Sequence, residues 1–125
     1  MSISDQVREF YANIDNESLL VRGTVTTPGA NTIIAQVTPG PAGLYEITAM
    51  GRYGAVADVI DNMELNRGGT LLGPLPVQPA VNGTPVFVTF TSRLAANAVI
   101  SVKSSLAGGA GAVYTAFILL KKVSD

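Results

Sequence analysis

Hydrophobic and polar residues alternate along most of the chain after residue 20, with the two-residue period of a β-strand. Glycine, proline and asparagine turn signals separate the alternating stretches. The pattern predicts about eight short strands, at 21–27, 31–38, 43–52, 63–67, 71–77, 86–92, 98–103 and 113–123. Short strands at this spacing favour an all-β fold, a sandwich or a barrel, over one that alternates strands and helices.

Individual stretches predict where their strands lie. In 31–38, Ile33, Ala35 and Val37 share one face. The stretch 71–77 contains two prolines, which suits an edge strand or a bulge. The last strand is apolar on both faces, which places it in the centre of a sheet or under a subunit contact.

The first 20 residues follow a different pattern. Val7, Phe10, Tyr11 and Ile14 recur at the spacing of one helix face, which predicts a short amphipathic helix. A helix of about ten residues is marginal by itself, so its apolar stripe must dock on something. Two alternatives remain open, packing on its own domain and reaching a neighbouring subunit. We therefore divide the chain into an arm, 1–20, and a β-domain, 21–125.

Composition excludes several functions. The 125 residues are 47% hydrophobic and 14% charged, with a net charge of −1, and contain neither cysteine nor histidine. There is no thiolate, no imidazole base and no basic excess for nucleic acid. No secretory signal and no membrane-spanning stretch is visible. We expect a protein that is not an enzyme, binds no cofactor and contacts neither nucleic acid nor membrane.

The same low charge predicts association. Soluble monomers usually need a charged surface, and this chain has few charges to provide one. Part of the surface is therefore expected to be covered by copies of the chain or by another protein.

Few residues suggest chemistry. Asp58, Asp61 and Glu64 are close enough in sequence to hold calcium, but their spacing is not that of a calcium loop, and solvated loop charges explain them better. Glu46 and Glu64 are the one carboxylate pair on predicted strands that could serve glycoside hydrolysis, and surface positions explain them better. Residues 108–111 are glycine-rich and read as a loop tip.

Several apolar residues are candidates for an interface. Tyr53 stands beside an arginine, and tyrosine and arginine are enriched at binding hot spots. The full candidate set combines the arm, this tyrosine and the last strand: Val7, Phe10, Tyr11, Ile14, Tyr53, Tyr114, Phe117 and Ile118.

Four motifs follow one another over roughly 80 residues: Gly43-Leu44-Tyr45-Glu46-Ile47, Leu65-Asn66-Arg67-Gly68-Gly69, residues 97–102 and the closing strand 114–120. In order and spacing they resemble the trimeric jelly rolls of the tumour-necrosis-factor and complement globular-head superfamily. The resemblance implies an antiparallel jelly-roll β-sandwich that self-associates, with function set by exposed loops.

In overall character the chain also resembles the small jelly-roll decoration, or cement, proteins of tailed-phage capsids: short, poor in charge, with an arm before a sandwich. This resemblance implies a homo-oligomer, a dimer or trimer, that binds a major capsid protein on the outer surface of the virion. The alternative is a trimeric head that recognises a glycan or protein receptor. A main shell subunit would need internal basic residues that this chain lacks.

Overall fold

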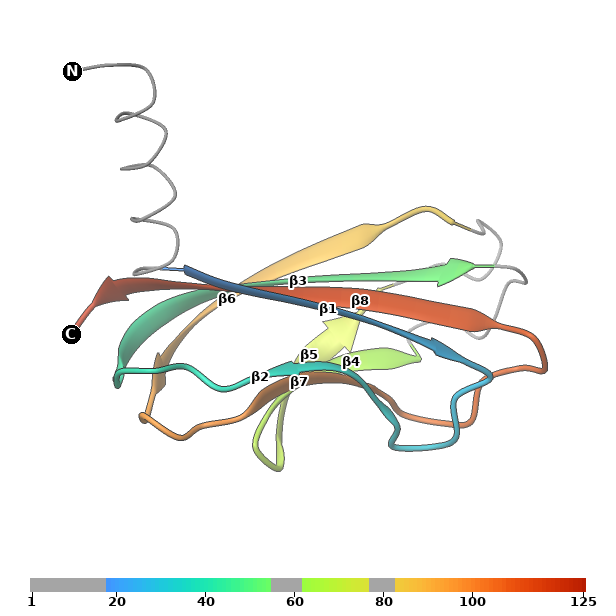
Figure 1. The fold of residues 1–125 in the computed structure, drawn as a ribbon, viewed down its shortest axis with the longest axis horizontal. Coiled ribbons are helices and arrows are strands. Elements are labelled where there is room, and N and C mark those ends of the chain that lie inside the picture. The colour runs from blue at the N-terminus through green and yellow to red at the C-terminus, as the bar shows by residue number, and fades with distance from the viewer. Residues whose placement is uncertain (1–17, 55–61, 77–82) are drawn as a thin grey trace, which may run out of the picture.

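The computed structural model describes residues 18–54, 62–76 and 83–125, and this part of the chain forms eight β-strands (Figure 1). They are β1 (Ser18–Thr26), β2 (Ile33–Val37), β3 (Gly43–Gly54), β4 (Met63–Arg67), β5 (Thr70–Leu75), β6 (Val86–Leu94), β7 (Ile100–Ser104) and β8 (Val113–Ser124). Each predicted strand has its counterpart. β1 begins three residues before the predicted boundary, so residues 18–20 belong to the sandwich. The predicted helix in the arm falls on residues 1–17, outside the described residues.

The strands form two four-stranded antiparallel sheets that lie one above the other (Figure 1). Sheet I has the order β1-β8-β3-β6, and sheet II has the order β2-β7-β4-β5. The chain crosses from one sheet to the other at every connection except that between β4 and β5. The last strand of each sheet lies between two earlier strands: β8 between β1 and β3, and β7 between β2 and β4. This order is the double Greek key of a jelly roll. The predicted antiparallel sandwich is therefore confirmed by strand order.

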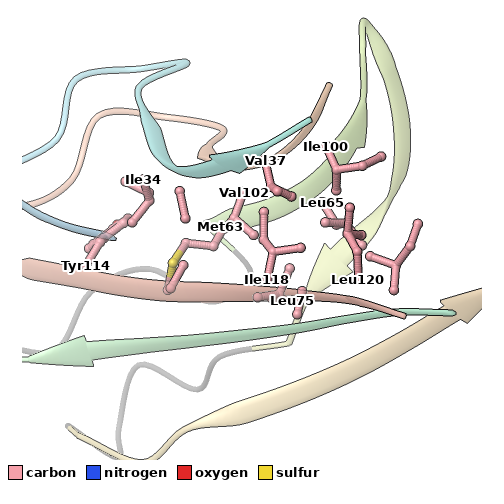
Figure 2. Packing of buried hydrophobic residues seen from close by; sticks show 14 of the residues in the cluster. Ile34, Val37, Met63, Leu65, Leu75, Ile100, Val102, Tyr114, Ile118 and Leu120 are labelled. Carbon is pink, nitrogen blue, oxygen red and sulfur yellow. The ribbon is translucent and has the colours of Figure 1, made fainter. Parts of the chain in front are cut away.

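The inward faces of the sheets form one core, and Figure 2 shows its side chains between the two layers. In β3, Tyr45, Ile47 and Ala49 point inward, as the alternation predicted. In β7, Ile100 and Val102 do the same. Burying a side chain such as Ile47 or Val102 contributes about 1.5–3 kcal/mol relative to leaving it exposed.

One predicted face is wrong, in β2. The sequence placed Ile33, Ala35 and Val37 together, but Ile33 is 49% exposed while Ile34, Ala35 and Val37 are buried. The cause is a register shift against β7 between Ile33 and Ala35. The extra residue of such a bulge reverses the face to which the preceding side chains point.

The two predicted special strand positions are confirmed. β5, which contains Pro74, is an edge strand of sheet II. β8 lies between β1 and β3 in the interior of sheet I.

A buried polar cluster closes the sandwich at the start of β4. Asn62 Nδ2 donates to Tyr114 Oη at 2.6 Å and to the Leu106 carbonyl at 3.0 Å, and its Oδ1 accepts from the Leu106 amide at 2.8 Å. The Asn62 amide donates to Tyr53 Oη at 2.9 Å. The two tyrosine rings pack with centroids 4.8 Å apart. Asn62 thus joins sheet II, the β7–β8 loop and sheet I.

The turn between β1 and β2 is tied to the same β7–β8 loop. Thr27 has a positive φ of 47°, and its hydroxyl accepts from the Gly111 amide at 3.0 Å. The Gly108 amide donates to the Pro28 carbonyl at 2.7 Å. Ser104 Oγ donates to the Gly29 carbonyl at 2.6 Å. These bonds hold the glycine-rich loop against its neighbour and compensate the strain at Thr27.

The two sheets approach each other closely where Gly23 of β1 faces the β2 backbone. A Cβ built on Gly23 would lie 1.8 Å from the Ile34 carbonyl oxygen, which belongs to the β2 backbone. Only glycine allows this approach without moving a strand.

Replacing Gly23 with alanine should lower the free energy of unfolding by at least about 2 kcal/mol, because the methyl group overlaps backbone that no rotamer can move. Gly40→Ala is the matched control, since a Cβ there meets nothing within 4 Å. Urea unfolding of both variants measures the difference. Equal stability of the two would contradict the close approach.

Asn62→Ala should lower the free energy of unfolding by about 2–4 kcal/mol, since it removes three hydrogen bonds and leaves the Leu106 groups without that partner. Asn97→Ala changes an exposed asparagine and should have an effect of at most about 0.5 kcal/mol. Thermal unfolding followed by circular dichroism compares them. A loss no greater at Asn62 than at Asn97 would show that the cluster does not support the fold.

Candidate interaction surface

The outer side of sheet I carries a group of apolar side chains. The register places Phe117 of β8 opposite Met50 of β3, and Met50 opposite Phe87 of β6. In the next row Leu20 of β1 lies opposite Leu119 of β8. Because residues opposite one another point to the same side of a sheet, these five side chains share one surface. We call Leu20, Met50, Phe87, Phe117 and Leu119 the apolar face.

The apolar face is accessible. Leu20 is 66% exposed and Phe87 is 58% exposed, while Met50 is only 6% exposed because its neighbours cover it. The Phe87 and Phe117 rings meet edge to face with centroids 5.8 Å apart. Aromatic side chains, methionine and arginine are the residue types enriched in protein interfaces. A contiguous set of such residues on a monomer surface marks an interaction site.

A shallow hollow of about 260 Å³ lies within this surface. Its lining residues come from all of sheet I and the segment before β6: Arg22, Met50, Arg52, Pro85, Phe87 and Phe117. The floor of the hollow is therefore apolar, and two guanidinium groups stand at its side.

The charges around the apolar face are mostly positive. Arg22, Arg52, Arg93 and Lys121 lie on the outward positions of sheet I, and Glu46 is the acidic residue among them. Within residues 18–54, 62–76 and 83–125 the one ion pair joins Lys122 and Asp125, at 2.6 Å. Neither Arg22 nor Arg52 is therefore neutralised by an acidic partner in the described part of the chain.

The outer side of sheet II is different. Asn66 lies opposite Ser101, and Glu64 lies opposite Lys103. Ser105 Oγ donates to Glu64 Oε2 at 3.0 Å. Two exposed apolar residues, Ile33 and Leu71, lie on the edge strands of sheet II, beside these polar rows. The aromatic pair and the methionine lie on sheet I.

A second hollow, of about 340 Å³, lies at the end of the sandwich between residues 42–43, 93–95 and Asp125. A hydrogen bond from Lys122, and then its positive charge, lower the pKa of Asp125. Arg93 Nη1 donates to the Asp125 carbonyl oxygen at 3.1 Å. Both bonds are exposed, and the one from Arg93 ties the end of β8 to β6 across β3.

The predicted interface residues divide into three groups. Tyr53, Tyr114 and Ile118 are fully buried in the core, which contradicts their assignment to an interface. Each sits on the inward side of its strand, so its side chain is used in packing the two sheets. Phe117 lies on the apolar face. The four arm residues, Val7, Phe10, Tyr11 and Ile14, lie outside the described residues.

The sequence interpretation missed Leu20, Met50, Phe87 and Leu119. The signal for Phe87 is present in the pattern of 86–92, where Val86, Val88 and Phe90 occupy one face and leave Phe87 on the other. A single large apolar residue on the polar side of an edge strand is the sign that could have found it.

Two sites were candidates for chemistry: the Glu46 and Glu64 carboxylate pair, and the acidic cluster of Asp58, Asp61 and Glu64. Glu46 points outward from sheet I and Glu64 points outward from sheet II, on opposite sides of the sandwich, so they cannot flank one glycosidic bond. Asp58 and Asp61 lie outside the described residues. In the described ranges no three acidic side chains gather as a metal site would require. The same ranges hold no helix long and apolar enough to span a membrane.

No family model matches the sequence, and no curated protein matches it. Solved structures that resemble the fold include the Eiger TNF of S. frugiperda, at 15% identity, 87% of this chain, 94% of that chain and a TM-score of 0.49. The C-terminal CBM6 of LamC, a laminarinase from Zobellia galactanivorans, matches at 14% identity, 84% and 99% coverage and a TM-score of 0.48. The PRD1 vertex protein P5 matches at 12% identity, 85% and 96% coverage and a TM-score of 0.49. At these values the likeness assigns neither a family nor a function, and the jelly roll rests on strand order.

Comparing Phe87→Ser with Ile118→Ala tests whether Phe87 is a surface residue, as the apolar face requires, or a core residue. Ile118→Ala should lower the free energy of unfolding by about 2–5 kcal/mol, because it leaves a cavity. Phe87→Ser should lower it by about 1 kcal/mol or less, since most of that side chain is already in water. Urea unfolding at low protein concentration measures both. A loss at Phe87 equal to that at Ile118 would mean that Phe87 is a core residue.

Proposed function

We propose that this protein is a non-enzymatic structural protein that associates with copies of itself and decorates the outside of a larger assembly. The observation that carries the proposal is the apolar face, with Phe87 and Leu20 largely exposed. A chain that is 14% charged has little else to keep such a surface from associating. Covering the face with protein removes this apolar area from water.

The assembly that fits best is the capsid of a tailed phage, with a major capsid protein as partner and the outer virion surface as location. The character of the sequence, an arm followed by a sandwich, resembles the cement proteins of such capsids. The mechanism is mechanical. Each contact needs only modest affinity, because many identical contacts on one shell act together.

The alternative is an oligomeric, trimeric head that recognises a glycan or a protein receptor. The aromatic pair Phe87 and Phe117 favours it, since exposed aromatic rings can stack on sugar rings. Glycan-array binding that is lost in Phe87→Ser would support this alternative. No glycan binding, together with capsid binding, would reject it.

Deleting residues 1–15 should leave a folded domain, because β1 begins only at Ser18. The native mass should fall from that of a dimer or trimer to that of a monomer, and binding to the shell should be lost. Light scattering after gel filtration measures the mass, and circular dichroism checks the fold. A full-length control with serine at positions 7, 10, 11 and 14 tests the apolar stripe without shortening the chain. An unchanged mass and unchanged shell binding in both variants would rule out an arm.

A further inference from the structure

We infer that the apolar face of one copy is the docking site for residues 1–17 of a neighbouring copy. The inference rests on the proposed self-association and names the surface and the segment that make the contact. Three observations carry it: the shape of the surface, its charge, and the direction in which β1 leaves the sheet.

The surface suits a polypeptide. Ligand pockets for small molecules usually enclose about 300–1,000 Å³ and bury most of the ligand. The hollow beside Phe87 and Phe117 is smaller, about 260 Å³, and lies open on a sheet. Such a hollow accepts a side chain projecting from a partner while the rest of the partner lies across the sheet. An amphipathic helix in an apolar groove binds in this manner.

Charge selects the partner. Arg22, Arg52, Arg93 and Lys121 surround the face against one acidic residue, Glu46. Two such faces packed on each other would bring like charges together, which is unfavourable.

Residues 1–17 have the complementary charge. They contain four carboxylates and one arginine, a net charge of −3, whereas the remainder of the chain has seven basic and five acidic residues, a net charge of +2. The acidic residues of the segment are Asp5, Glu9, Asp15 and Glu17.

The segment also has the apolar side chains to fill the hollow. Its sequence predicts a helix face of Val7, Phe10, Tyr11 and Ile14. A helix this short gains most of its stability from burying that face. The apolar face of sheet I offers such a surface, with Leu20 66% and Phe87 58% exposed.

The direction of β1 points to a neighbouring copy. β1 runs from Ser18, opposite Lys121, to Thr26, opposite Val113. The hollow lies between these ends, at the row where Arg22 faces Phe117. A segment that continued the line of β1 before Ser18 would leave sheet I beyond Lys121, and it would have to turn back to cover the hollow of its own copy. No reversal is needed to reach another copy.

The chain contains no cysteine, so single cysteines can map the contact in the full-length protein. A tagged Tyr11→Cys protein and an untagged Phe87→Cys protein are mixed and oxidised with copper–phenanthroline. We expect a mixed disulfide between the two. Leu71→Cys replaces Phe87→Cys in the control, because Leu71 is similarly exposed, at 54% against 58%, on sheet II. We expect no such product from the control.

Charge provides a second measurement on the same pair. Adding Arg22→Glu and Arg52→Glu to the Phe87→Cys protein should slow formation of the mixed disulfide by about tenfold, since two attractive pairs become repulsive. Adding Gln36→Glu and Thr38→Glu, exposed positions on the sheet II side, should change the rate by less than about twofold.

Four results would overturn the docking. The first is equal linking by Leu71→Cys, and the second is disulfides only between two Phe87→Cys proteins. The third comes from a protein that carries both Tyr11→Cys and Phe87→Cys and is oxidised in the same way: a disulfide within one chain and none between chains. The fourth is no effect of the arginine reversals. Each leaves the proposed function standing if the wild-type protein is still an oligomer. A monomeric wild-type protein, measured by light scattering, would instead overturn the proposed function and the docking with it.

Discussion

The last strand is apolar on both sides, and a two-layer sandwich can cover only one of them. β8 lies in the interior of sheet I, with Ile118 and Leu120 directed into the core and Phe117 and Leu119 directed outward. The inward side is satisfied by sheet II. The outward side adds to Met50 and Phe87 on the neighbouring strands and forms the apolar face. The need to cover this second side links the fold of the domain to its proposed role in an assembly.

Much of the fold could be predicted from the sequence because strand formation here depends on local alternation and turn residues. The eight strands, the edge position of β5 and the central position of β8 all follow from that pattern. The bulge in β2 could not be predicted, since it depends on how β2 pairs with β7, far away in the chain. The boundary of β1 was also misplaced, because its first residues, 18–20, pair with β8 despite a weak alternation.

The candidate surface was harder to predict than the fold. Tyr53 and Tyr114 look like contact residues by type, yet both are in the core, where their hydroxyls accept from Asn62. Tyrosine occurs both in cores that supply a partner for its hydroxyl and at interfaces, so its type alone does not distinguish the two. Phe87 and Met50 belong to strands whose other side packs the core, and only the register between β3 and β6 brings them together. A surface shared by several strands needs the tertiary arrangement, which alternation within one strand does not provide.

The glycine-rich loop between β7 and β8 has a composition that suggests freedom of movement, but its backbone is engaged. The amides of Gly108 and Gly111 donate to the β1–β2 turn, and the Leu106 amide donates to Asn62. Without side chains to pack, the loop is held almost entirely through its peptide groups. The Gly108 and Gly111 amide protons therefore exchange with solvent when their bonds to the β1–β2 turn open, and not through movement of the loop alone. Exchange at this end of the sandwich would then report a cooperative unit assembled from segments about 80 residues apart in the chain.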